Sequence, residues 1–166
     1  RRTIGAQTED QEIELRARGQ LSQAIEQSSG ISVTSYNRKV LLSGQVASTQ
    51  DKARAEQIVA ALPNVRSVHN ELQVLGRPSF TTTAADTSIT ARVKTALIEA
   101  PDLHANTIKV VTESGTVYLM GLVSEREAAR AAQVASRVSG VQRVVTVFEL
   151  ISEEEARAST KAAQQQ

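Results

Sequence analysis

The chain of 166 residues carries 19 Lys and Arg against 18 Asp and Glu, which gives a formal net charge of +1 at pH 7. The two signs are spread evenly, so the sequence lacks the basic patch that is typical of a nucleic-acid-binding protein. It contains no cysteine, which excludes disulfides and thiolate metal sites within these residues. No apolar run approaches the roughly 18 residues of a membrane-spanning helix.

The chain is a tandem duplication of one small α/β unit. A motif of alternating apolar residues in the first half, Val40, Leu42, Gly44 and Val46, recurs 77 positions later as Val117, Leu119, Gly121 and Val123. Further along the unit the offset is 76, so that Ile58, Leu62, Val65 and Val68 match Val134, Val138, Val141 and Val144. The chain therefore predicts two domains of similar fold.

The first unit begins with a polar segment, residues 1–9, which we expect to be an unpacked leader. From Asp10 onward, apolar residues recur three or four positions apart, which predicts a helix with one buried face. Acidic residues gather at its predicted start, where the helix dipole favours them. Alternating apolar residues then predict two hairpin strands over residues 31–36 and 39–46.

A second helix is predicted over residues 48–61, and Ala53, Ile58 and Leu62 are expected among its inner positions. Pro63 ends this helix, and the apolar residues from Val65 to Val74 predict a third strand. The order of elements in the unit is therefore α-β-β-α-β. This order is typical of an α+β fold in which a three-stranded mixed sheet packs on two helices.

A segment rich in Gly, Pro and Thr follows and separates the units. In the second unit, Asp86 or Thr87 is the expected cap of a helix that ends near Pro101. Ser124 and Glu127 predict a capping box at its second helix. The tail is expected to be a frayed helix or disordered. The predicted divisions are a leader (1–9), a first unit (10–75), a linker (76–85), a second unit (86–151) and a tail (152–166).

The sequence offers few residues suited to catalysis, metal binding or phosphate binding. His69 and His104 have no second histidine or carboxylate at a spacing suited to metal ligation, and the glycine-rich phosphate-binding motifs are absent. Gly44 and Gly121 are predicted where a strand passes to a helix, at points of close backbone approach, and we expect them to be structural. The sequence therefore predicts no catalytic residue, no metal and no cofactor.

One helix has an unusual outer face. On a helical wheel of residues 86–99, the core-facing positions are Ile89, Val93, Ala96 and Leu97. Ile98 projects to the opposite side, in a small amphipathic rim with Ser88, Ala91, Arg92, Lys94 and Thr95. Such a rim can enter a lipid headgroup layer while its cations meet lipid phosphates. A lone exposed isoleucine is also common at ordinary surfaces, and Ile98 packing on the other unit is a further alternative.

These residues resemble a known family. The G-x-V motif, its helix and the following V-x-x-V strand resemble the BON domain, and the chain has two copies. The segments RRTIGAQTED, ADTSITARVKTALI and VYLMGLVSEREAARAAQVASRVSGVQRVV resemble the dual-BON outer-membrane lipoproteins of Gram-negative bacteria, the DolP (YraP) family. The resemblance extends from Arg1 to about Leu150 and is more specific in the second unit.

The resemblance implies a non-enzymatic periplasmic protein that is tethered to the outer membrane by a lipidated cysteine upstream of Arg1. It implies binding of anionic phospholipid such as phosphatidylglycerol, a role in envelope integrity and a location at division sites. The best-known member has Trp where this sequence has Ser88, and Trp favours membrane interfaces. Carried over by position, the lipid-binding residues are Ser88, Ala91, Arg92, Lys94, Thr95 and Ile98.

Two alternatives remain open at this point. The same rim, or the groove between the units, is compatible with a module that binds envelope-assembly or cell-wall proteins. A soluble periplasmic BON protein of the osmotic-stress type is the other alternative, and it would lack the upstream lipidated cysteine.

Overall fold

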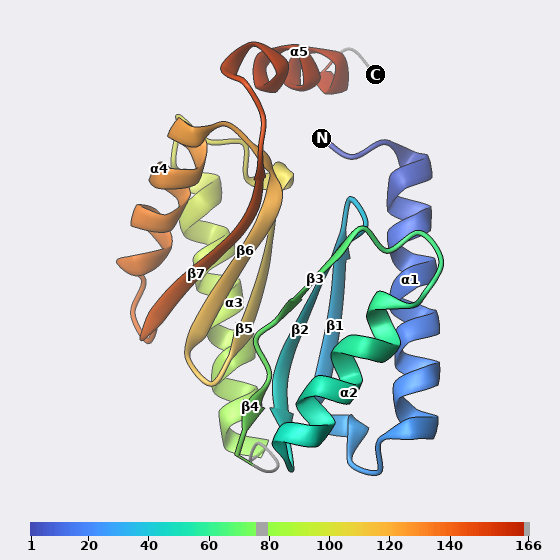
Figure 1. The fold of residues 1–166 in the computed structure, drawn as a ribbon. Coiled ribbons are helices and arrows are strands. Elements are labelled where there is room, and N and C mark those ends of the chain that lie inside the picture. Colours follow the sequence, from blue (N-terminus) through green and yellow to red (C-terminus); the bar gives the residue numbers. More distant parts are fainter. Residues whose placement is uncertain (76–79, 165–166) are drawn as a thin grey trace. The chain divides into compact units, whose positions relative to one another are not determined.

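The computed structural model describes residues 1–75 and 80–164, and the side chains of residues 80–81 and 162–164 lie outside that description. The chain forms two compact units, one of residues Arg2–Ser79 and one of Phe80–Gln166 together with Arg1. Each unit has its own apolar core between helices and a sheet. Figure 1 shows the same arrangement of elements in both.

The first domain has a mixed sheet. Strands β1 and β2 form an antiparallel hairpin, and β2 pairs in parallel with β3 and with β4. The predicted third strand is thus interrupted, and both of its pieces lie along β2. The elements are α1 (Ile4–Ala24), the short 3-10 helix η1 (Ser28–Gly30), β1 (Ile31–Tyr36), β2 (Lys39–Val46), α2 (Thr49–Ala60), β3 (Ser67–Asn70) and β4 (Gln73–Val74).

The second domain repeats this plan with an unbroken third strand. Its sheet has the order β5-β6-β7, antiparallel and then parallel, and Ala156 of the added helix α5 is buried. The predicted α+β class with two α-β-β-α-β units is confirmed. The elements are α3 (Phe80–Glu99), η2 (Ala105–Thr107), β5 (Ile108–Glu113), β6 (Thr116–Val123), α4 (Glu125–Ser136), β7 (Arg143–Leu150) and α5 (Glu153–Gln164).

The inner faces of the first helices were predicted well. Ile13, Ala17 and Leu21 are buried in the first core, and so are Ile89, Val93 and Leu97 in the second, with Ala96 half-buried. In α2 the prediction was partly wrong, because Ala53 is exposed and Ala55 and Val59 are buried instead. Ala53 and Ala55 lie on opposite sides of this helix, so the alanines alone do not fix which face turns inward.

Both first helices begin earlier than predicted. Helix α1 starts at Ile4, because Thr3 caps it by accepting a hydrogen bond from Ala6 N at 3.0 Å. Residues 4–9 are thus helical and not an unpacked leader. Helix α3 starts at Phe80. The predicted linker accordingly overlaps α3 over 80–85, and its residues 76–79 lie outside the described residues.

Asp10 and Asp86 are not helix caps but hold the hairpin turns of their own domains. Asp10 accepts hydrogen bonds from Asn37 N and Arg38 N, both at 2.8 Å. Asp86 accepts them from Ser114 N at 2.6 Å and Gly115 N at 2.9 Å. All four turn residues have positive φ, which points successive N–H groups at one acceptor. The interpretation of Asp86 or Thr87 as a cap was therefore wrong.

Gly44 and Gly121 lie inside β2 and β6, not at the passage from strand to helix. A Cβ at Gly44 would lie 2.1 Å from Gly30 O, and one at Gly121 would lie 2.5 Å from Thr107 O. Close backbone approach is thus the reason for both glycines, as expected. The predicted capping box of Ser124 and Glu127 is present at the start of α4.

Candidate functional site

The outward face of α3 is exposed and carries no exposed acid between Thr83 and Ile98. The one carboxylate in this stretch, Asp86, is buried against the hairpin turn. Ile98 is 71% exposed at the end of the face, next to the exposed Lys94. Glu99, the last residue of α3, is also exposed, so the face carries the two cations Arg92 and Lys94 against one acid at its end. Its predicted members all lie at exposed positions, namely Ser88, Ala91, Arg92, Lys94, Thr95 and Ile98.

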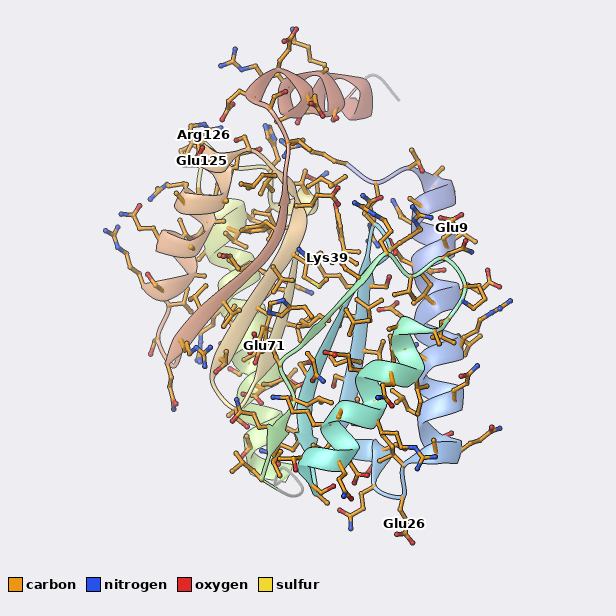
Figure 2. The ribbon with its side chains drawn as sticks, in the orientation of Figure 1. Glu9, Glu26, Lys39, Glu71, Glu125 and Arg126 are labelled. Carbon is orange, nitrogen blue, oxygen red and sulfur yellow. The ribbon has the colours of Figure 1, made fainter. Side chains whose placement is uncertain are left out.

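The corresponding face of α1 has a different character. Positions 76 residues earlier hold Glu12 for Ser88 and Ser22 for Ile98, and Glu9 is also exposed. Figure 2 shows Glu9 on the outer side of α1. Arg16, which corresponds to Arg92, is ion-paired with Glu12 at 2.6 Å. One fold thus presents a mixed-charge helix in the first domain and a cationic one in the second.

Two hollows flank α3 on opposite sides. The larger has a volume of about 650 Å³ and contains Ser88 and Arg92. Its other walls come from the β5–β6 turn and from the segment between α4 and β7, and they include Ser114, Gly115, Gly140 and Gln142. Sequence reasoning missed these four residues, because they come from two segments of the chain that are distant from α3 in sequence.

The smaller hollow has a volume of about 330 Å³ and lies between the C-terminal half of α3 and the start of β5. It brings Lys94 and Ile98 together with Asn106 and Ile108. Ala91 and Thr95 lie on the ridge between the two hollows, where the Thr95 hydroxyl donates to Ala91 O at 3.0 Å. The predicted residues are thus divided between two flanks and a ridge of one helix.

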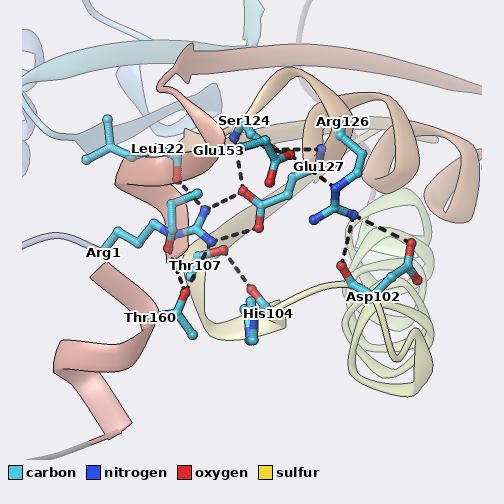
Figure 3. Close-up of polar contacts among 11 residues, drawn as sticks. Arg1, Asp102, His104, Thr107, Leu122, Ser124, Arg126, Glu127, Glu153 and Thr160 are labelled. Atoms are coloured by element: carbon cyan, nitrogen blue, oxygen red, sulfur yellow. Dashed lines mark hydrogen bonds and ion pairs between the residues drawn. The ribbon is translucent and has the colours of Figure 1, made fainter. Parts of the chain in front are cut away.

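A dense polar cluster lies where α4 begins and α5 passes over it (Figure 3). Arg1 donates two hydrogen bonds of 2.7 Å to the carboxylate of Glu127 and one of 2.9 Å to Leu122 O. The two side chains are only 2% and 3% exposed. Burial raises the pKa of Glu127, but the hydrogen bonds from Arg1 and from Ser124 N outweigh it, so that this pKa is lowered.

The same cluster fastens α5 to the domain. Glu153, in the first turn of α5, accepts a hydrogen bond from the Ser124 hydroxyl at 2.6 Å and one from Arg126 at 3.1 Å. The Ser124 hydrogen bond is the main reason that the pKa of Glu153 is lowered. Asp102 pairs with Arg130 at 3.1 Å. Because each carboxylate in this cluster already has a cationic partner, the arrangement is that of a structural clamp.

His104 lies at the edge of this polar cluster (Figure 3), where its backbone carbonyl accepts a hydrogen bond from the Thr107 hydroxyl at 2.7 Å, whereas His69 belongs to the first domain. His69 Nε2 lies 2.7 Å from Glu71 Oε1, a single pair. Within residues 1–75 and 80–164, no group of three His, Asp or Glu side chains is placed to hold a metal ion. No helix in that part of the chain combines the length and apolar character needed to cross a membrane.

Comparison with known families defines the class of the protein. The model of the BON domain matches residues 9–76 and again 85–151, so the chain belongs to the BON-domain family and carries two copies. The resemblance drawn from the sequence is therefore confirmed.

Its similarity to individual proteins extends across both domains. The chain is 33% identical over 152 residues to the outer membrane lipoprotein DolP of Haemophilus influenzae, covering 90% of this chain and 79% of that one. It is 32% identical over 152 residues to a 21 kDa hemolysin of Actinobacillus pleuropneumoniae, covering 90% and 78%. Osmotically-inducible protein Y of Escherichia coli is 32% identical over 120 residues, covering 70% of this chain and 60% of that protein. The chain is thus a DolP-like dual-BON protein.

Proposed function

We propose that the protein is a non-enzymatic, periplasmic lipoprotein of the outer membrane that binds anionic phospholipid through α3 and supports envelope integrity. The observation that carries the proposal is the outward face of α3, which lacks exposed acids up to Ile98 and ends in that exposed isoleucine beside Lys94. The similarity to an outer membrane lipoprotein over 90% of the chain supports the location.

The expected affinity is modest. Full burial of an isoleucine side chain contributes about 1.5–3 kcal/mol, and each Lys or Arg near an anionic surface about 1 kcal/mol. Ser88 adds little, whereas Trp at this position in the best-known member favours the interface. Such modest contributions to the binding free energy are sufficient for a protein that a lipid anchor already holds near the membrane, because the anchor raises the effective concentration of the membrane surface.

The test is co-sedimentation of the chain with vesicles that contain phosphatidylglycerol and with purely zwitterionic ones, at two salt concentrations. We expect binding to the anionic vesicles that weakens as salt rises. Ile98→Glu removes the apolar contact and Lys94→Glu reverses a charge, so each should weaken binding at low salt by at least roughly tenfold.

The duplication supplies matched controls. Ser22→Glu and Arg18→Glu place the same charges at the corresponding exposed positions of α1, and they should leave binding within about twofold of the wild type, as surface changes remote from the site do. If the α1 variants lost as much vesicle binding as the α3 variants, the net charge of the protein alone would account for the effect. Binding to neither kind of vesicle would overturn the proposal and leave the protein-interaction alternative.

A further inference from the structure

One edge of the second sheet is formed by β7, which pairs with β6 and with no other strand in the described part of the chain. The strand has eight residues without a proline or a lysine, two of the residue types that protect exposed edges. Thr146, near its centre, is exposed. An unbroken edge of this length offers its outward backbone groups to another strand.

The corresponding edge of the first domain is closed by a side chain. Its strand is interrupted between β3 and β4, where Leu72 N donates to Asn70 Oδ1 at 3.2 Å. At an offset of 76 residues, Asn70 corresponds to Thr146 and Leu72 to Phe148. The second domain therefore lacks the amide that occupies the edge in the first, and β7 continues without interruption.

The hydrogen-bond ladder determines which backbone groups of β7 point outward. Ile151 N donates to Val123 O at 2.8 Å, in line with the parallel register of β6 and β7. In a regular strand the N–H and C=O of one residue point to one side, and those of the next residue point to the other. The odd-numbered residues of β7 therefore bond to β6, while Val144, Thr146 and Phe148 direct their N–H and C=O groups to the outer edge.

Charges near the two ends of β7 make this edge complementary to itself. Arg143 lies at its start and Glu149 near its end, with uncharged residues between them. Among the described residues, Arg143 has no ion-pair partner. Glu149 has an interaction within its own chain, and a carboxylate can accept several hydrogen bonds at once. The first domain has Ser67 and Gln73 at the corresponding positions, so this charge pattern belongs to the second domain.

We propose that β7 pairs with β7 of a second copy of this chain, antiparallel and about a two-fold axis at Thr146. In this register Thr146 lies opposite its own counterpart and Val144 lies opposite Phe148, so that the outward backbone groups of the two strands bond one another. The same register places Arg143 opposite Glu149 at both ends, in positions where side chains approach most closely.

The backbone and the charges select the same register. Shifting the pairing by one residue would misalign the outward backbone groups, and shifting it by two would separate the charges. The interface is isologous, because the same surface of each copy contacts the other. It goes beyond the proposed function, since it uses the edge of the sheet and not α3.

Sedimentation velocity of the full chain at concentrations up to about 1 mM, a range that detects weak association, tests the proposal. We expect a reversible monomer–dimer equilibrium that weakens as salt rises. Thr146→Pro removes an outward N–H but no bond to β6, so it should weaken dimerisation at least roughly tenfold and keep the fold, which amide NMR signals check. Thr146→Ala retains that N–H and should dimerise within about twofold of the wild type.

The charged residues test the register separately. Arg143→Glu places two acids opposite each other at both ends and should weaken dimerisation roughly tenfold at low salt. Glu149→Arg should do the same through two cations. An equimolar mixture of these two variants restores opposite charges at both ends, so it should form a heterodimer. Arg54→Glu makes the same change at an exposed position of α2 and should leave dimerisation within about twofold of the wild type.

A heterodimer in the mixture supports the register, because antiparallel pairing about Thr146 brings these two positions together. A chain that stays monomeric at every concentration overturns the proposal and leaves the edge to an extended segment of another protein. A dimer that Thr146→Pro and Arg143→Glu leave unchanged also overturns it, because association would then use another surface. Losses in both charge variants without recovery in their mixture would overturn the antiparallel register.

Discussion

Single glycines in this chain have different roles, and the atoms around each decide which. Gly44 lies where β2 passes the end of η1, so closely that a Cβ would meet Gly30 O at 2.1 Å. Gly19 lies within α1, and a Cβ there would meet nothing within 4 Å. The first is required by the packing of the backbone, while the second only loosens the helix that contains it.

Substituting alanine at these two positions should move stability in opposite directions. Gly44→Ala combines a backbone clash with a φ of +104°, and we expect a loss on the order of 3 kcal/mol in the free energy of unfolding. Gly19→Ala should raise it by about 0.5–1 kcal/mol. Urea unfolding of the full chain, followed by amide signals of the first domain, measures both. A stable Gly44→Ala variant would contradict the proposed close contact.

At the scale of elements, each first helix is fixed to its hairpin by one buried aspartate. The sequence predicts that both helices exist, but it misplaces where they start, and this contact is the reason for the misplacement. Apolar spacing predicts the existence of α1 and α3, because burial of one face imposes a local period. It misplaces their starts, because Asp10 and Asp86 have the appearance of helix-start residues. Their actual partners lie 27 to 29 positions away in the chain, beyond any local pattern.

The aspartate contact should make the stability of the first domain depend on pH. Burial raises the pKa of Asp10, but hydrogen bonds from Ser35, Arg38 N, Arg2 and Asn37 N outweigh it, so that this pKa falls below its ordinary value of 3.8. A carboxyl whose pKa is lower in the folded state binds fewer protons there than in the unfolded state. Its contribution to stability is therefore complete above that ordinary value and is lost as the pH falls from there through the lower pKa of the folded state.

Asp10→Asn should remove that dependence. At pH 7 we expect the first domain to lose on the order of 2 kcal/mol, the scale of hydrogen bonds to a charged group. The difference from the wild type should shrink as the pH falls below about 4, near the unfolded aspartate value. Urea unfolding at several pH values measures it, with the exposed Glu26→Gln as control. A difference that stays constant with pH would contradict the assigned charge state.

On the scale of the whole molecule, duplication has kept one fold and changed its surfaces. The helical wheel predicted the outward position of Ile98, because that position follows from the phase of a single helix. The hollow around Arg92 could not be predicted in this way, since three separate segments form it. A comparison of the two copies, position by position, would have pointed to this hollow. The second domain has Ser88, Gly115 and Gly140 where the first has Glu12, Arg38 and Asn64.

This divergence predicts that membrane binding can be transferred between the copies. In the Ile98→Glu background, we would introduce Glu9→Ala, Glu12→Ser and Ser22→Ile into α1, each copying the corresponding residue of α3. Leu15 is already exposed on that face. The changes remove two acids and add one apolar contact, terms of about 1 kcal/mol per charge and 1.5–3 kcal/mol for the isoleucine.

We expect the altered chain to recover binding to anionic vesicles to within about tenfold of the wild type, since the restored terms match those lost at Ile98. Co-sedimentation with vesicles that contain phosphatidylglycerol, compared with purely zwitterionic vesicles, measures the recovery. If a folded variant recovers no binding, the outward face of the helix is insufficient for membrane binding.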